Sequence, residues 1–199
     1  ADYQHALEAA QALLQDAELD VRGEQASGAA CAAISSESSV CRSGATVTQF
    51  PQETQEIGLL LASLNQATPT SCRDALCTKR TGPQDFWNNV DETQGITLGQ
   101  MTASDVAARY GQFTGAISGG KSNSILASRE TGKGGWYWIE ILPYDANAGN
   151  SGLIANDSPR LALYMQPQVI YRITAIAHGR KSGTQVVLQQ TYVRQKRRD

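Results

Sequence analysis

Residues 169–178 read VIYRITAIAH, residues 179–183 read GRKSG and residues 184–193 read TQVVLQQTYV, and this stretch decides the fold. Both arms alternate with a two-residue period. One face of the arms carries the following residues: Val169, Tyr171, Ile173, Ala175 and Ala177 in the first, with Val186, Leu188 and Tyr192 in the second. Such alternation around a glycine-bounded basic loop predicts a long antiparallel hairpin.

Two further strands are expected before this hairpin. The run WYWIEIL over 136–142 alternates but is apolar on both faces, which indicates a strand that is buried on both sides or one that meets the helix on one face. The run RLALYM over 160–165 predicts a short strand, after a polar loop at 145–159. We therefore expect three or four antiparallel strands, grouped late in the chain.

Helical periodicity is clearest at the beginning of the chain. Residues 3–20 predict an amphipathic helix that ends at Gly23 or Gly28 and packs on the sheet. The expected packing face is narrow and rich in alanine: Leu7, Ala10, Leu13, Leu14 and Ala17. Shorter helices are expected at 52–65 and from Thr102 or Ser104 to Tyr110, and Phe86 and Trp87 are expected to anchor the turn between them.

Helix first and strands last predict an α+β fold. A chain of 199 residues fits one domain. We divide it into a helix at 1–22, an irregular region with short helices at 23–135, an antiparallel sheet at 136–193 and a basic tail at 194–199.

The four cysteines lie in the irregular region. They allow three disulfide pairings, of which the local one is the simplest: Cys31–Cys41 with Cys72–Cys77. The spacings C-x9-C and C-x4-C fit a zinc site poorly. We expect two disulfides and an oxidising compartment; zinc binding and free buried thiols are the alternatives.

Charge is distributed unevenly along the chain. The formal net charge of −2 combines −8 over residues 1–100 with +6 over residues 101–199. The sequence has no dense basic stripe, the feature that would indicate a nucleic-acid binder. It also has no window of about 18 apolar residues, so it predicts no membrane span. The chain starts within a helical pattern and without Met, so we expect a processed or truncated form.

No catalytic or metal-binding constellation stands out. His5 and His178 have no partner at ligand spacing and are expected at the surface. Asp145–Asn150 begins like a calcium loop but lacks the later acidic ligands. Trp87, Trp136 and Trp138 leave open a sugar-binding platform, although burial in the core is the simpler interpretation. We expect no cofactor, no metal and no enzymatic activity.

Several separated segments resemble PilX-type minor pilins of bacterial type IV pili. The closing hairpin, with YRIT at 171–174 and VVLQ at 186–189, is the most specific of them. CRDALC at 72–77, followed by Phe86-Trp87, resembles a C-x-x-G-L-C feature with a later Trp, although Ala75 replaces the expected Gly. YWIE at 137–140 resembles a pilin strand, and the first helix resembles the second half of the long pilin helix.

The resemblance implies a pilin head with its N-terminal helix packed on the sheet. It implies a non-catalytic minor pilin that primes pilus assembly and joins a tip complex presenting a PilY-type adhesin. Its partners would be other minor pilins, the major pilin and that adhesin. It would face the periplasm from the inner membrane, held by an apolar half-helix before Ala1, and later reach the pilus tip. The alternatives are a K-type pseudopilin of type II secretion and a secreted carbohydrate- or ligand-binding module.

Overall fold

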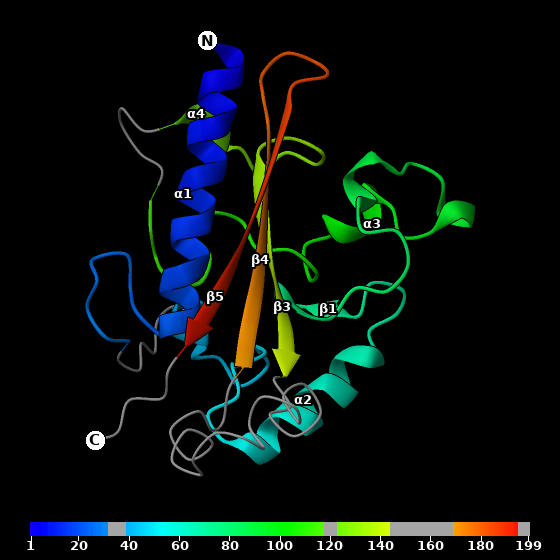
Figure 1. Ribbon diagram of the computed structural model, residues 1–199. Coiled ribbons are helices and arrows are strands. Elements are labelled where there is room, and N and C mark those ends of the chain that lie inside the picture. Colours follow the sequence, from blue (N-terminus) through cyan, green and yellow to red (C-terminus); the bar gives the residue numbers. More distant parts are fainter. Residues whose placement is uncertain (32–38, 118–122, 144–168, 195–199) are drawn as a thin grey trace, which may run out of the picture.

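A long N-terminal helix lies against one face of a five-stranded sheet, and loops with short helices cover part of the other face (Figure 1). The computed structural model describes residues 1–31, 39–117, 123–143 and 169–194. The expected α+β class is confirmed. The strand expected at 160–165 and the calcium-like fragment at 145–150 lie outside the described residues.

Helix α1 (Asp2–Arg22) is the longest element. It ends because Gly23 adopts a left-handed conformation (φ 68°, ψ 40°), in which the N–H of Gly23 donates to the carbonyl of Asp20 and the N–H of Glu24 donates to the carbonyl of Leu19. The other helices are α2 (Thr54–Asn65), α3 (Leu98–Met101) and α4 (Ser124–Ala127), and the 3-10 turns are η1 (Val40–Arg42), η2 (Phe86–Asn88) and η3 (Glu92–Gln94).

The sheet has the order β1-β2-β3-β4-β5. Its strands are β1 (Cys72–Arg73), β2 (Leu76–Thr78), β3 (Gly135–Pro143), β4 (Val169–His178) and β5 (Gln185–Arg194). The predicted hairpin β4–β5 is confirmed, but a wholly antiparallel sheet is wrong at one pair, because β2 runs parallel to β3. The long connection between β2 and β3 provides the crossover that a parallel pair needs.

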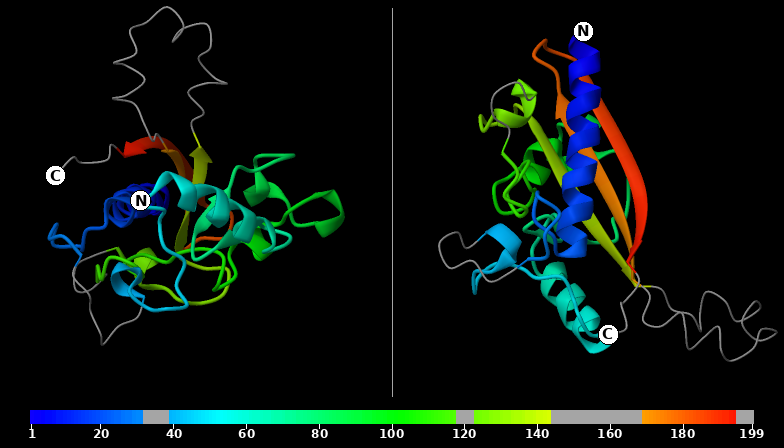
Figure 2. Two further views of the ribbon diagram at one scale, coloured as in Figure 1. Left: turned by 90° about the horizontal axis from the view of Figure 1, so that it is seen from below. Right: turned by 90° about the vertical axis from the view of Figure 1, so that its left-hand side faces the viewer.

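Both faces of the central strand β3 are buried, as predicted. Tyr137, Ile139 and Ile141 join the core under α1, together with the odd-numbered residues of β4. Trp136 and Trp138 point the other way, into a second cluster that contains Phe86 and Met101. The right-hand view in Figure 2 shows α1 in front of the sheet, where it contacts β3, β4 and β5.

The helix predicted from Thr102 or Ser104 to Tyr110 is wrong. The helix in this region lies earlier, where Thr97 and Gln100 form a capping box at the start of α3. Beyond it, the carbonyls of Asp105 and Val106 accept from the N–H groups of Asp74 and Ala75, each at 2.9 Å. The segment forms only a turn, in which the N–H groups of Val106 and Ala107 donate to the carbonyl of Ala103, and its next backbone groups bond to the β1–β2 hairpin.

Candidate functional site

The junction between α1 and the sheet contains the main candidate site. Of the predicted packing face, Ala10, Leu13 and Ala17 are fully buried, and Leu7 and Leu14 are partly buried against the same cluster. The buried face is wider than expected and also includes these residues: Ala6, Ala9, Asp16, Asp20 and Val21. Small side chains allow the helix backbone to come close to the sheet, and two carboxylates are enclosed with them.

Asp20 is the centre of a buried polar network at the C-terminal end of α1. Arg42 donates to both of its oxygens, from Nε to Oδ1 at 2.8 Å and from Nη2 to Oδ2 at 2.6 Å. The hydroxyl of Tyr137 on β3 donates to Oδ2 at 2.8 Å. This network joins the helix, the sheet and the turn η1, and such fork-to-fork pairing has a strict geometry.

The environment of Arg42 fixes its orientation. Its guanidinium carbon lies 3.8 Å from the ring centroid of Phe113 and 4.8 Å from that of Phe50. Its Nη1 donates to the carbonyl of Thr48 at 2.8 Å. The carboxylate of Asp20 raises the pKa of Arg42 against the opposing effect of burial. The arginine is thus charged and held on three sides.

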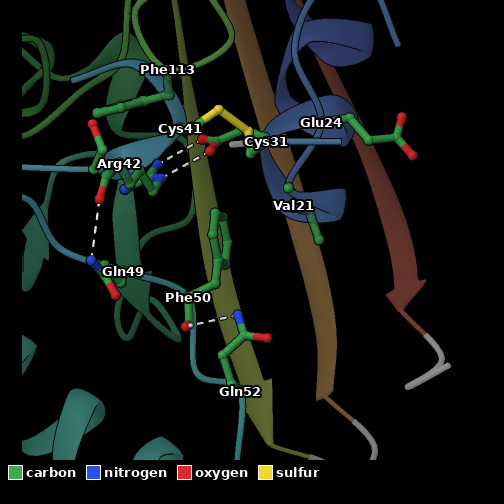
Figure 3. Close-up of a pocket in the computed structure, with 12 residues that line it drawn as sticks. Val21, Glu24, Cys31, Cys41, Arg42, Gln49, Phe50, Gln52 and Phe113 are labelled. Carbon is green, nitrogen blue, oxygen red and sulfur yellow. Dashed lines mark hydrogen bonds and ion pairs between the residues drawn. A yellow bond between two sulfur atoms is a disulfide. The ribbon is translucent and has the colours of Figure 1, made fainter. Parts of the chain in front are cut away.

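A hollow of about 300 Å³ opens beside this network (Figure 3). Its walls include Val21, Phe50, Phe113 and the Cys31–Cys41 disulfide, and Arg42 and Asp20 lie within it. Among the described lining residues, no buried polar side-chain atom lacks a hydrogen-bond partner. The buried polar groups in the wall of the hollow therefore all bond to the protein itself.

Asp16 lies one turn before Asp20 and faces the loop 111–114. It accepts from the N–H of Gly111 at 2.7 Å and from the hydroxyl of Thr114. Burial raises its pKa from 3.8 to about 6, in spite of these two donors. This carboxylate is therefore a group whose charge changes in the mildly acidic range.

A third buried carboxylate, Glu140, lies on the opposite face of β3. Arg80 Nη2 contacts its Oε1 at 2.7 Å, and Arg172 Nη2 contacts its Oε2 at 2.6 Å. Glu140 is fully buried, whereas the side chain of Arg172 is 28% exposed. Two arginines share one carboxylate, so this cluster carries a net positive charge.

The structure pairs the cysteines locally, as Cys31–Cys41 and Cys72–Cys77. The first disulfide connects the loop after α1 to η1, the turn that carries Arg42. The second closes the β1–β2 hairpin. Each cross-link thus fixes a loop segment that contributes to the junction or to the sheet edge.

The other residues considered for chemistry do not form a site. Trp136 and Trp138 are 1% and 0% exposed, so the sugar-binding platform is wrong. His5 is exposed as expected, but His178 is half-buried and stacks edge-on against Trp136. Across the described ranges, no group of three or more His, Cys, Asp or Glu residues has the arrangement of a metal site.

Comparison with known families identifies the sheet-bearing part of the chain. The family model described as type IV pilus assembly protein PilX, C-terminal, matches residues 63–194. The chain belongs to the PilX family. No curated protein and no solved structure gives a significant match. No helix among the described residues is long and apolar enough to cross a bilayer.

The PilX match covers all five strands, the second disulfide and the Glu140 cluster. Asp16, Asp20 and Arg42 lie before the matched residues, although they pack against this PilX sheet. Sequence reasoning missed these three residues. A signal was present: Asp16 and Asp20 follow Leu13 at spacings that place them on the apolar stripe of the helix. Carboxylates at such positions need buried partners.

Proposed function

We propose that this PilX-family chain is a minor pilin that primes type IV pilus assembly and forms part of the tip complex presenting a PilY-type adhesin. The observation that carries the proposal is the family match over residues 63–194, which includes the whole sheet. The role is structural and non-catalytic. Its partners are other minor pilins, the major pilin and the adhesin.

The arrangement of α1 supports this role. The helix packs against β3, β4 and β5, and its C-terminal end is fixed by the Asp20–Arg42 pair. At the other end, Asp2 accepts from the backbone N–H groups of Arg180 and Lys181, at 2.8 and 3.2 Å. A helix anchored at both ends transmits force from a stalk to the head without sliding on the sheet.

We also propose the location that goes with this function: the inner membrane facing the periplasm before assembly, then the pilus tip at the cell surface. The two disulfides support an oxidising compartment.

Deletion of the gene in its own bacterium tests the proposal. We expect loss of surface pili, counted by electron microscopy and in sheared fractions, with recovery on complementation. We also expect the other minor pilins and the PilY-type protein to co-purify with a tagged copy. Normal piliation in the deletion strain would contradict the proposal. Normal pili with defective type II secretion would instead support the K-type pseudopilin.

A further inference from the structure

The outer edge of β5 is a long and regular strand edge. In the sheet order, β5 is terminal, and no described element pairs with its outer side. Its ten residues pair with β4 without a gap in register, from His178↔Gln185 to Val169↔Arg194. Figure 2 (right) shows β5 as the outermost strand beyond α1.

The hydrogen-bond pattern assigns the backbone groups that face outward. The N–H of His178 donates to the carbonyl of Gly134, and the N–H of Gly179 donates to the carbonyl of Thr184, so the backbone N–H and C=O groups of odd-numbered residues in β4 point toward β5. By antiparallel pairing, the backbone groups of even-numbered residues in β5 point toward β4, and those of odd-numbered residues point away from the sheet. The outward-facing residues are Gln185, Val187, Gln189, Thr191 and Val193.

This edge lacks the features by which proteins usually protect such strands. Natural edges carry proline, bulges or inward-pointing charges that prevent pairing with another chain. Strand β5 contains no proline and no bulge, and none of its residues is charged except Arg194 at its end. Three of the outward-facing residues, Gln189, Thr191 and Val193, are exposed. An unprotected edge of this length fits an added strand.

Charge indicates what kind of strand fits. Residues 169–194 contain four basic residues and no acidic one. On the face of the sheet opposite α1, the carboxylate of Glu140 is already shared between Arg80 and Arg172. The acids that reach the hairpin, Asp2 and Glu18, come from α1 and bond to the loop and to Gln190. A second copy of the hairpin would bring like charges together, whereas an acidic strand would be attracted.

We propose that the outer edge of β5 accepts an extended, acidic segment of a partner protein, which adds a sixth strand beside Thr191. The backbone groups of the odd-numbered residues give the affinity, and the positive hairpin selects acidic over basic segments. The proposal goes beyond the role in pilus assembly, because it assigns a surface and a partner chemistry, and its test needs only the purified chain.

The test uses two fluorescein-labelled peptides with the purified 199-residue chain. One has the sequence Thr-Val-Glu-Val-Thr-Val-Glu-Val-Thr, and the other has Lys in place of Glu. Fluorescence anisotropy at low salt is expected to show about tenfold tighter binding of the acidic peptide. Amide exchange by NMR is expected to show new protection at Val187, Gln189 and Thr191, but none at even-numbered residues, which already bond to β4.

Substitutions at Thr191 locate the binding. Thr191→Pro removes one outward N–H without removing a β4 bond and is expected to weaken acidic-peptide binding about tenfold. Thr191→Val keeps the N–H and is expected to bind as the parent does. Should Thr191→Pro unfold the chain, Thr191→Glu carries the test, because a new negative charge on the edge is expected to weaken binding of the acidic peptide and to reduce its advantage over the basic one.

Three results would overturn the proposal. The first is equal binding of the acidic and basic peptides, or no binding of either at about 1 mM. The second is unchanged binding by a folded Thr191→Pro chain. The third is a dimer in light scattering that Thr191→Pro abolishes, because the edge would then pair with a second copy of this chain.

Discussion

Arg42 and Asp20 form a buried ion pair that joins the disulfide-bridged loop to the end of α1. Both partners are nearly inaccessible, with side-chain exposures of 4% and 3%. Arg42 belongs to η1, next to Cys41, so the loop 39–50 is held to the helix by the ion pair and by the disulfide together. The pair therefore holds the C-terminal end of α1 to the segment that carries η1.

Arg42→Ala is expected to lower the free energy of unfolding by about 3–5 kcal/mol, because Asp20 would be left buried without its charged partner. Urea unfolding followed by circular dichroism measures this loss. The double variant Asp20→Asn with Arg42→Met is expected to lose less than Arg42→Ala, because no unpaired charge remains.

The matched control for Arg42 is Arg22→Ala, which breaks the exposed pair Arg22–Glu24. Those side chains are 42% and 28% exposed, and the pair spans 3.4 Å. An exposed pair contributes at most about 1 kcal/mol. Equal losses in Arg42→Ala and Arg22→Ala would show that the buried pair does not hold the junction.

Asp16 is expected to make stability depend on pH. Burial raises the pKa of this carboxyl to about 6 in the folded state, so the folded chain holds the proton more tightly than the unfolded chain. Between about pH 4 and pH 6, the contribution of Asp16 to the free energy of unfolding therefore falls as the pH rises. Over the whole window the loss is on the order of 2–3 kcal/mol.

Asp16→Asn removes this titration. We expect the stability of the variant, relative to the parent, to increase between pH 4 and pH 7, as measured by urea unfolding at several pH values. Any effect of Asn on packing is constant with pH, so the slope isolates the carboxyl. The matched control, Glu8→Gln on the exposed side of α1, is expected to leave the slope unchanged. If the difference in free energy of unfolding between Asp16→Asn and the parent does not change with pH, burial of the Asp16 carboxylate is not what makes stability depend on pH.

Local patterns predicted the elements whose side chains repeat regularly. Alternation predicted β3, β4 and β5, and the helical stripe predicted α1 and α2, because each of these elements packs regularly spaced apolar side chains, fully or partly buried, against the core. The YWIE strand and the hairpin also carried the resemblance to the PilX family. The order of these elements was enough for the α+β class.

Contacts between segments far apart in the sequence were not predictable in the same way. Strands β1 and β2 are too short for a periodic pattern, and they join the sheet because β2 pairs with β3, which lies far along the chain. The partners of Asp20 come from η1 and β3, and no local spacing links them. The segment 102–110 has helical propensity, but its backbone bonds to the β1–β2 hairpin.

Leu13 of α1 packs directly over Gly135 of β3. A Cβ at Gly135 would lie 2.6 Å from Leu13 Cδ1 and 3.1 Å from the carbonyl oxygen of Ile176. Leu13 is fully buried, so its side chain has little space into which to move. The absence of a side chain at Gly135 is therefore what allows the helix to lie this close to β3.

Gly135→Ala is expected to lower the free energy of unfolding by about 1–3 kcal/mol through overpacking. Leu13→Ala alone is expected to cost about 2–5 kcal/mol through a cavity. In the double variant the new methyl group partly fills that cavity, so the combined loss is expected to be smaller than the sum of the two single losses.

Gly58→Ala is the control, since it lies inside α2 with no atom within 4 Å of the added Cβ, and it is expected to stabilise by about 0.5–1 kcal/mol. Strict additivity of the Gly135 and Leu13 losses would show that the two residues do not set the helix–sheet distance.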